Sequence, residues 1–286
     1  DDRSLIVVGG GKTMDTAKAV ADNYKAAVII VPTTASTDAP AMGLSVIYTA
    51  AGEHVGARHY KKNPDLVLLD TDVISKAPVR FFVAGMGDAL STYIECRANK
   101  QSASPNYVNT GYHQTIAGMA VSKACHETVL AKGVNAKLAA EKGLCTKDVE
   151  DVIEANTLLS GIGFESAGLA GAHAIHNGFT VLEECHHMYH GEKVAFGTLT
   201  QLVLENVPLD ELEDIILWCI EVGLPVTLAE LGAGNVTDDQ LMEVAKTACA
   251  ETDTLHNMPF EVTPETVFAA IKAADAYGRY YLDEEE

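Results

Sequence analysis

The fold is decided by residues 4–18, which read SLIVVGGGKTMDTAK. A short apolar run rich in β-branched residues is followed by three glycines and then by good helix formers. This order predicts a strand, a tight turn and a helix. Glycine lets the backbone approach a ligand closely, and the first N–H groups of a helix attract an anion. The stretch therefore predicts a phosphate-binding turn, and we expect its strand to lie in the middle of a nucleotide-binding sheet.

Two stricter nucleotide motifs fail at this turn. A P-loop would need a glycine five residues before Gly11, where the chain has Ile6. The dinucleotide pattern G-x-G-x-x-G would need its last glycine at the position of Met14. A turn that serves only the packing of helix on strand therefore stays open as the alternative.

The composition is strongly acidic. Forty acidic and 20 basic side chains give the 286-residue chain a formal net charge of −20. Nucleic acids and anionic membranes favour positive patches, so we expect neither as a partner. No apolar run reaches the roughly 18 residues that span a bilayer. The scattered cysteines, without a C-x-x-C pair, indicate reduced thiols and a cytoplasmic protein. They are Cys96, Cys125, Cys145, Cys185, Cys219 and Cys249.

The chain changes character at Pro78. Before it, apolar strands are expected at 27–32, 44–49 and 66–70, and strands that are apolar throughout predict a parallel sheet covered on both faces. We therefore expect an α/β part in residues 1–78, with an incomplete parallel nucleotide-binding sheet, and an all-α domain in residues 79–286. The helices expected there are 79–98, 104–130, 148–177, 190–206, 208–222, 238–250 and 264–281.

The histidines gather in one region, since five of the ten fall between residues 173 and 190. His173 and His176 are three residues apart and share a helix face. His190 begins the next expected helix, so two helix ends that meet would bring it to His173. Histidines that only pack in the core or on the surface are the alternative, and we expect it for His186 and His187.

An acidic residue in the helical part suggests a further ligand. Asp88 lies in an apolar stretch with two glycines, FVAGMGDALS. A buried carboxylate is costly unless it is paired or binds a metal. One carboxylate and two imidazoles with open positions predict a Lewis-acid site for zinc or ferrous iron.

The chain resembles the iron-type (group III) alcohol dehydrogenases, which share a dehydroquinate synthase-like architecture. The matching stretches follow the family's order and cover essentially the whole chain. They are residues 9–12 with Asp15 and Lys18, 31–40, 44–48, 85–88, 173–178 and 189–197.

The resemblance implies an NAD-dependent oxidation of glycerol to dihydroxyacetone at a divalent metal, usually zinc, with Fe²⁺ as the other ion. It implies Asp88, His173 and His190 as the metal ligands. Asp38 is implied near the glycerol hydroxyls, although a turn residue is its alternative, and either His176 or a chain of bound water is expected to relay a proton. We also expect a homo-oligomer. The implied cofactor-binding residues are Gly10, Gly11, Lys12, Asp15, Thr33, Thr34, Ser36, Leu44 and Tyr48.

Two departures from the family's pattern matter. The family has several tens of residues before the glycine turn, with an acidic residue for the adenosine ribose. The resemblance therefore implies a missing N-terminal segment, with weak NAD binding and little activity as the expected result. Where relatives carry a small or polar pair, this chain has Met42 and Gly43, and Met42 either crowds the nicotinamide or repacks.

Two other functions stay open at this stage. One is a lyase like the dehydroquinate synthases, which also use a metal and NAD. That function needs a basic pocket for a phosphorylated substrate, and the few clustered arginines of the helical part disfavour it. The other is a metal-binding remnant without catalytic activity.

Overall fold

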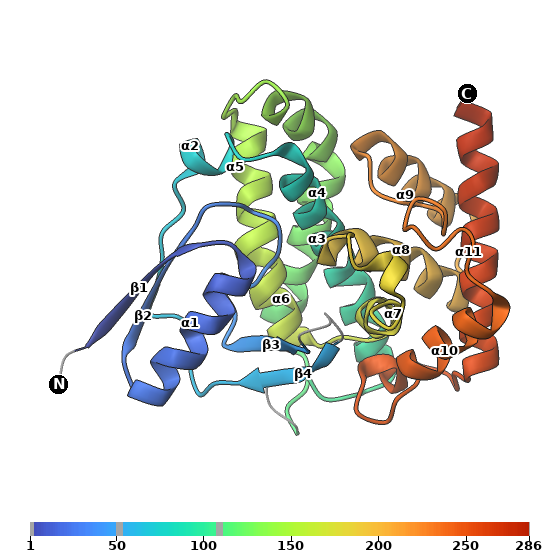
Figure 1. Ribbon diagram of the computed structural model, residues 1–286, viewed down its shortest axis with the longest axis horizontal. Helices are drawn as coiled ribbons and strands as arrows, with labels where there is room; N and C mark the ends of the chain where they lie inside the picture. Colours follow the sequence, from blue (N-terminus) through green and yellow to red (C-terminus); the bar gives the residue numbers. More distant parts are fainter. Residues whose placement is uncertain (1–2, 50–53, 107–110, 286) are drawn as a thin grey trace.

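The computed structural model describes residues 3–49, 54–106 and 111–285. Its N-terminal part holds a small parallel sheet and the remainder is mostly helical, as expected (Figure 1). The elements of the first part are β1 (Ser4–Gly9), α1 (Gly11–Tyr24), β2 (Ala27–Pro32), β3 (Leu44–Tyr48), β4 (His54–His59), β5 (Leu66–Val67) and α2 (Thr71–Ile74).

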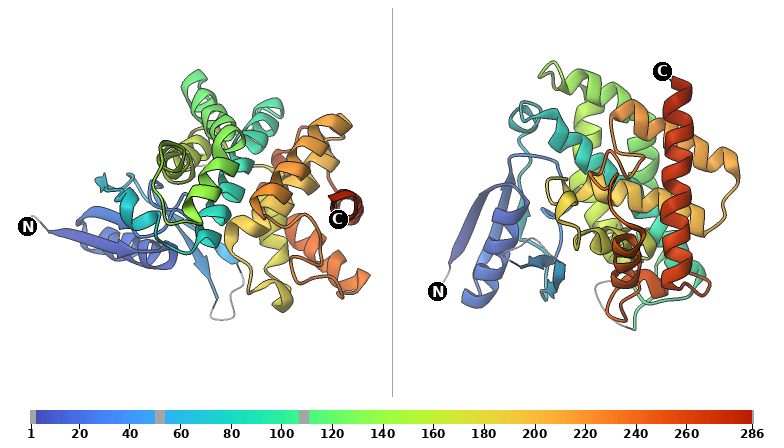
Figure 2. Two further views of the ribbon diagram at one scale, coloured as in Figure 1. Left: turned by 90° about the horizontal axis from the view of Figure 1, so that it is seen from above. Right: turned by 45° about the vertical axis from the view of Figure 1, so that its right-hand side comes forward.

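The helical remainder forms one large apolar core and ends in a long helix, which lies on the side of the molecule farthest from β1 (Figure 2). Among the described residues, none of the helices is long and apolar enough to cross a membrane. The elements of this part are α3 (Val79–Gln101), α4 (Ile116–Ala140), α5 (Lys147–Glu154), the π-helical turn η1 (Ala155–Leu159), α6 (Ser160–Ala167), α7 (Gly171–Phe179), the 3₁₀ turn η2 (Glu183–Cys185), α8 (His190–Leu204), α9 (Leu209–Val222), α10 (Asp238–Ala248), the 3₁₀ turn η3 (Thr254–Asn257) and α11 (Pro264–Glu285).

The parallel sheet has the order β1-β2-β5, with Ser4 opposite Ala27 and Gly9 opposite Pro32. The expectation that β1 lies in the middle of the sheet is therefore wrong for the described residues, because β2 is central and β1 is an edge strand. Helix α1 packs on one face, where Val7 is buried (Figure 1).

The other face of the sheet is open, so the expected cover on both faces is wrong for the described residues. Ile6 and Val8 on this face are 64% and 61% exposed. Apolar composition shows that a strand prefers burial, but it cannot show which element of the chain supplies the cover.

The remaining strands differ from the expectation. β3 pairs antiparallel with β4 in a separate two-stranded sheet. β4 was not predicted, because its sequence HVGARH has little apolar character. β5 is limited to two residues, because the chain pairs with β2 only at Leu66 and Val67.

The helix expected over 148–177 is interrupted. The chain stays helical from α5 through η1 to α6, and then it turns at Gly168, whose φ is +96°. A new helix, α7, begins at Gly171, so His173 and His176 lie on a short helix of their own. The helix expected at 104–130 is displaced, because α4 spans 116–140; residues 107–110 lie outside the described part.

Glycines let three backbone segments touch. A Cβ atom at Gly191 would lie 1.8 Å from the Ala84 carbonyl oxygen, so the first turn of α8 lies directly on α3. A Cβ atom at Gly85 would lie 1.9 Å from the Ala35 oxygen, so α3 also lies directly on the loop after β2. Both contacts exclude any larger residue, and both flank Asp88.

We predict that Gly191→Ala destabilises the fold. The added methyl group has no space, so α8 must move away from α3, at a cost of about 3 kcal/mol. At roughly 2–4 °C per kcal/mol, the midpoint of thermal unfolding should fall by about 6 °C or more.

The control for this variant is Gly11→Ala, where the nearest atom to the new Cβ is 3.9 Å away. Calorimetry of both variants measures the difference. Equal midpoints would show that α3 and α8 are not held in this contact.

Candidate metal and cofactor site

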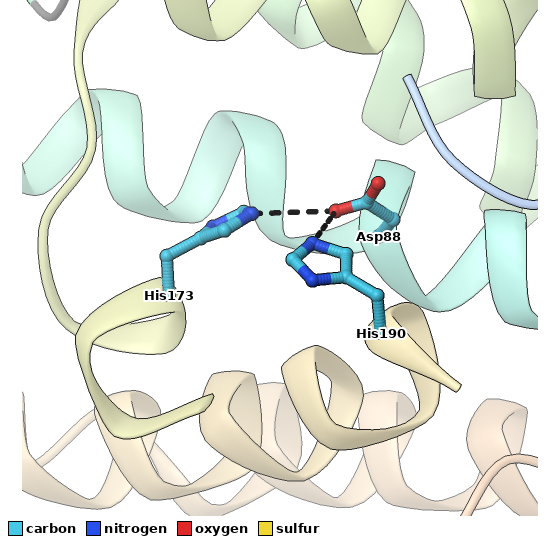
Figure 3. A group of neighbouring side chains, drawn as sticks. All are labelled: Asp88, His173 and His190. Carbon is cyan, nitrogen blue, oxygen red and sulfur yellow. Dashed lines mark ion pairs between the residues drawn. The ribbon is translucent and has the colours of Figure 1, made fainter. Parts of the chain in front are cut away.

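Three side chains converge where α3, α7 and α8 meet. Asp88 comes from α3, His173 from α7, and His190 is the first residue of α8 (Figure 3). The Nε2 atoms of both imidazoles lie 3.3 Å from Asp88 Oδ1, and one ligand atom of each residue lies within 4.8 Å of the others. Asp88 is fully buried, whereas His173 is 14% and His190 23% exposed. The structure thus brings together the three residues that the resemblance implies.

Helix α7 begins without a capping side chain of its own, because Ala170 precedes it. Two buried side chains from other helices accept its first N–H groups instead. Glu95 Oε1 on α3 accepts from the amides of Ala170 and His173, each at 3.0 Å. Gln201 on α8 accepts from the two amides between them, those of Gly171 and Ala172. The position of α7, and with it His173, is therefore fixed by α3 and α8.

The start of α8 is held by charged groups. Glu192 accepts a hydrogen bond from the Tyr189 amide at 2.7 Å, which closes the first turn around His190. Arg80 on α3 donates to the same carboxylate at 2.6 and 2.9 Å and lies over the Tyr189 ring. These contacts fix the backbone on both sides of His190.

The imidazole of His173 has a fixed orientation. Its Nδ1 lies 2.5 Å from Glu95 Oε2. A carboxylate only accepts, so Nδ1 carries the proton of the neutral ring and donates to Glu95. The lone pair of Nε2 then points at Asp88. A carboxylate behind a metal-binding histidine commonly orients it in this way.

A metal ion fits this group. Asp88 Oδ1 is buried and forms no hydrogen bond, although two imidazole nitrogens lie close to it. Such an oxygen is costly without a partner. Two ligands at about 2.0 Å from a tetrahedral zinc ion are about 3.3 Å apart, the separation found from Asp88 Oδ1 to each Nε2. Two nitrogens and one oxygen suit zinc or ferrous iron.

The titration of the site also favours a cation. Burial alone would raise the pKa of Asp88, but His190 and His173 lower that pKa below its usual value. Burial likewise opposes charge on His173, yet Glu95 and Asp88 raise the pKa of its imidazole well above the ordinary value. The spot between these groups is therefore occupied most favourably by positive charge, either a proton or a metal ion.

The glycine turn is open to a ligand. Helix α1 begins at Gly11, and no side chain caps its first N–H groups. A Cβ atom at Gly10 or Gly11 would meet only a threonine hydroxyl 3.9 Å away. Lys12 is exposed beside the turn. Bare backbone, a helix N-terminus and a basic side chain together suit a phosphate group.

The loop after β2 connects this turn with the group of Asp88, His173 and His190, hereafter the metal group. Its hydroxyl residue Thr37 lies nearest to Gly11, and Thr34 lies nearest to Gly10. Thr33 and Ser36 are half-buried in the same loop, and the Ser36 hydroxyl lies 3.3 Å from that of Thr34.

Asp38 carries the loop to the metal group. Its amide donates to Asp88 Oδ2 at 3.3 Å, and the Ser160 hydroxyl donates to its carboxylate at 3.1 Å. Asp38 is 4% exposed. Burial and the nearby Asp88 carboxylate raise its pKa well above the usual value. The glycine turn and the metal group are thus joined through one short segment.

Two buried charged residues brace this loop, and sequence reasoning gave neither a role in the site. The Lys18 ammonium donates to the carbonyls of Ala39 and Leu44 at 2.9 and 2.5 Å and pairs with Asp15 at 3.1 Å. Glu165 on α6 accepts from the Gly43 amide at 2.6 Å. Met42 is 4% and Leu44 2% exposed, and both pack in the core between sheet and helices, while Tyr48 ends β3.

The other histidines of the region separate into two kinds. His176 is buried, and its Nε2 lies 3.1 Å from His190 Nδ1. It therefore contacts the nitrogen of His190 that does not face Asp88. Burial, His190 and Lys193 lower its pKa well below the ordinary value. His186 and His187 are exposed, and His186 contacts the Thr180 carbonyl rather than the metal group.

Some supporting residues were missed from the sequence. Glu95 follows Asp88 by two helical turns in an equally apolar stretch, so the buried-carboxylate argument applied to it as well. Asn156, on the π-helical turn, donates to the carbonyls of Ala35 and Phe82 at 3.1 Å, and no local pattern indicates that contact.

The comparisons with known proteins identify the family. The pattern of the iron-containing alcohol dehydrogenases matches residues 3–71. The glycerol dehydrogenase of Citrobacter freundii is 56% identical over 280 residues, which is 98% of this chain and 76% of that protein. The glycerol dehydrogenase of Thermotoga maritima is 53% identical, over 96% of this chain and 75% of that protein. The crystal structure of glycerol dehydrogenase from Schizosaccharomyces pombe matches with a TM-score of 0.96 and 44% identity, over 100% of this chain and 72% of that chain. The chain therefore belongs to the iron-containing alcohol dehydrogenase family.

We predict that Asp88→Ala, His173→Ala and His190→Ala each abolish the binding of one zinc ion per chain. The matched controls His186→Ala and His187→Ala should keep it, because both residues are exposed outside the group. Metal analysis after equilibrium dialysis measures the content. Equal zinc in all five variants would refute this ligand set.

Proposed function

We propose that this chain is a metal-dependent polyol dehydrogenase that oxidises glycerol to dihydroxyacetone with NAD. The observation that carries the proposal is the convergence of His173 and His190 on Asp88 Oδ1, a buried oxygen without a hydrogen-bond donor. The names of the relatives, glycerol dehydrogenases at 56% and 53% identity, support the same substrate. The test is NADH absorbance at 340 nm with glycerol and zinc, with dihydroxyacetone identified as product.

The reaction divides between groups that the chain binds and the chain's own residues. A divalent ion lowers the pKa of a bound alcohol, and the nicotinamide takes up hydride. Asp88, His173 and His190 would hold that ion. Asp38 accepts a hydrogen bond from Ser160 and lies beside Asp88, which supports a proposed role in orienting the hydroxyl groups of a polyol.

The glycine turn is the proposed pyrophosphate site, and residues 1–78 are the proposed cofactor domain beside a metal and substrate domain in 79–286. The uncapped start of α1 and the hydroxyls near it support this assignment. The residues proposed to hold NAD are Gly10, Gly11, Lys12, Asp15, Thr33, Thr34, Ser36, Leu44 and Tyr48.

A role in proton movement is proposed for His176. Its Nε2 faces His190 Nδ1, so it acts on the site through that ring. We further propose a cytoplasmic homo-oligomer. The six free cysteines support the compartment, and the open apolar face around Ile6 and Val8 supports association.

We predict that Asp38→Asn raises the Michaelis constant for glycerol about tenfold or more, because a buried polar group that loses its hydrogen-bond partner costs about 1–3 kcal/mol. Zinc content and NAD affinity should change little. Steady-state kinetics, metal analysis and NAD titration measure the three quantities.

The control for this variant is Asp214→Asn, an exposed aspartate on α9. A loss confined to NAD affinity would place Asp38 in the cofactor site instead.

A further inference from the structure

A chain of hydrogen bonds leads away from the metal group behind His190. His190 Nδ1 lies 3.1 Å from His176 Nε2. His176 Nδ1 lies 3.0 Å from the side-chain oxygen of Asn177, whose NH₂ group donates to Asp253 Oδ2 at 2.9 Å. This series of hydrogen bonds thus runs through α7 and ends at Asp253, the residue before η3.

In each hydrogen bond of this series, only one of the two groups can be the donor. The Asp253 carboxylate has no proton to donate, so it accepts and turns the NH₂ group of Asn177 toward itself. The oxygen of Asn177 then faces His176 Nδ1, which must donate.

The polarity continues to the metal group. With its proton on Nδ1, neutral His176 offers a lone pair at Nε2, so His190 Nδ1 must donate to it. The proton of a neutral His190 is thereby held on Nδ1, and its Nε2 lone pair points at Asp88. That tautomer is the one in which Nε2 can bind a metal.

We propose that Asn177 and Asp253 are positioning residues that act through His176 to hold His190 in its metal-binding tautomer. The inference rests on the proposed function, because it concerns a ligand of the proposed metal. His173 and His190 are then treated alike: a carboxylate sets the proton of each ring, Glu95 directly and Asp253 through two intermediate side chains.

The surroundings hold the side chains of this hydrogen-bonded series in place. His176 is 1% exposed, so water does not compete for its nitrogens. Asp253 is anchored by its other oxygen, which accepts from the Thr254 amide at 2.7 Å. Thr254 in turn donates to the Ala170 carbonyl at 2.8 Å, at the start of α7. The same segment therefore holds both ends of α7, the helix that carries His173 and His176.

The polarity can be reversed without a change of shape, which separates this role from simple bracing. In Asp253→Asn the new oxygen still caps η3, so its NH₂ group faces Asn177. The Asn177 amide then turns, its NH₂ group faces His176 Nδ1, and the proton of His176 moves to Nε2. His190 must accept at Nδ1, so its own proton moves to Nε2 and points at the metal group.

The experiment compares Asp253→Asn with the control Asp239→Asn, an exposed residue on α10. Imidazole ¹⁵N shifts of the metal-free protein report the tautomer of His176, and competition with a chromophoric chelator reports zinc affinity. We expect His176 to change from the Nδ1–H to the Nε2–H form and zinc affinity to fall about 10–100-fold. The control should change neither.

The double variant Asn177→Asp with Asp253→Asn restores the original polarity, because the carboxylate at 177 accepts from both neighbours. It should recover the Nδ1–H form of His176 and much of the zinc affinity. An unchanged tautomer in Asp253→Asn, with or without zinc loss, would overturn the proposal, and so would a double variant as weak as the single one. The tautomer readout needs no metal, so it stands even if the unaltered chain bound no zinc and the proposed function failed.

Discussion

The structure depends on one buried oxygen. Asp88 Oδ1 has no hydrogen bond, and two imidazole nitrogens face it at 3.3 Å. Because Asp88 is fully buried, such an arrangement requires a proton or a metal ion. The contacts around it serve to keep it in place: bare glycine backbone presses α8 onto α3, and α7 takes its capping groups from those two helices.

The same site explains how the two parts of the chain work together. The loop after β2 touches the glycine turn at one end, and at the other its Asp38 amide bonds to the second oxygen of Asp88. Lys18 and Glu165, both buried, hold the intervening backbone. A cofactor phosphate bound at the turn and a metal bound at Asp88 would therefore have a fixed separation, which hydride transfer to a nicotinamide requires.

Much of this arrangement could be predicted from the sequence. The glycine turn gave β1 and α1, and β2 was predicted with its observed bounds. The cost of burying an acid indicated Asp88, the clustered histidines indicated a metal site, and the family resemblance implied His173 and His190 as the other two ligands.

Other features depend on contacts between distant residues, which local patterns do not record. The break between α6 and α7 requires a positive φ at Gly168, and β4 forms only because β3 pairs with it. The proposed role of Asp253 depends on a residue 76 positions further along the sequence folding back onto Asn177. The open face of the sheet was missed because apolar strands indicate burial without showing what covers them.

The central claim is that one metal ion is bound by two imidazoles and one carboxylate. X-ray absorption at the zinc edge of the zinc-loaded chain tests it most directly, because six free cysteines offer sulfur as a competing ligand. Zinc bound by these residues should show nitrogen and oxygen neighbours at about 2.0–2.2 Å, with the multiple-scattering signature of two imidazoles. Sulfur at about 2.3 Å, or a single imidazole, would contradict it.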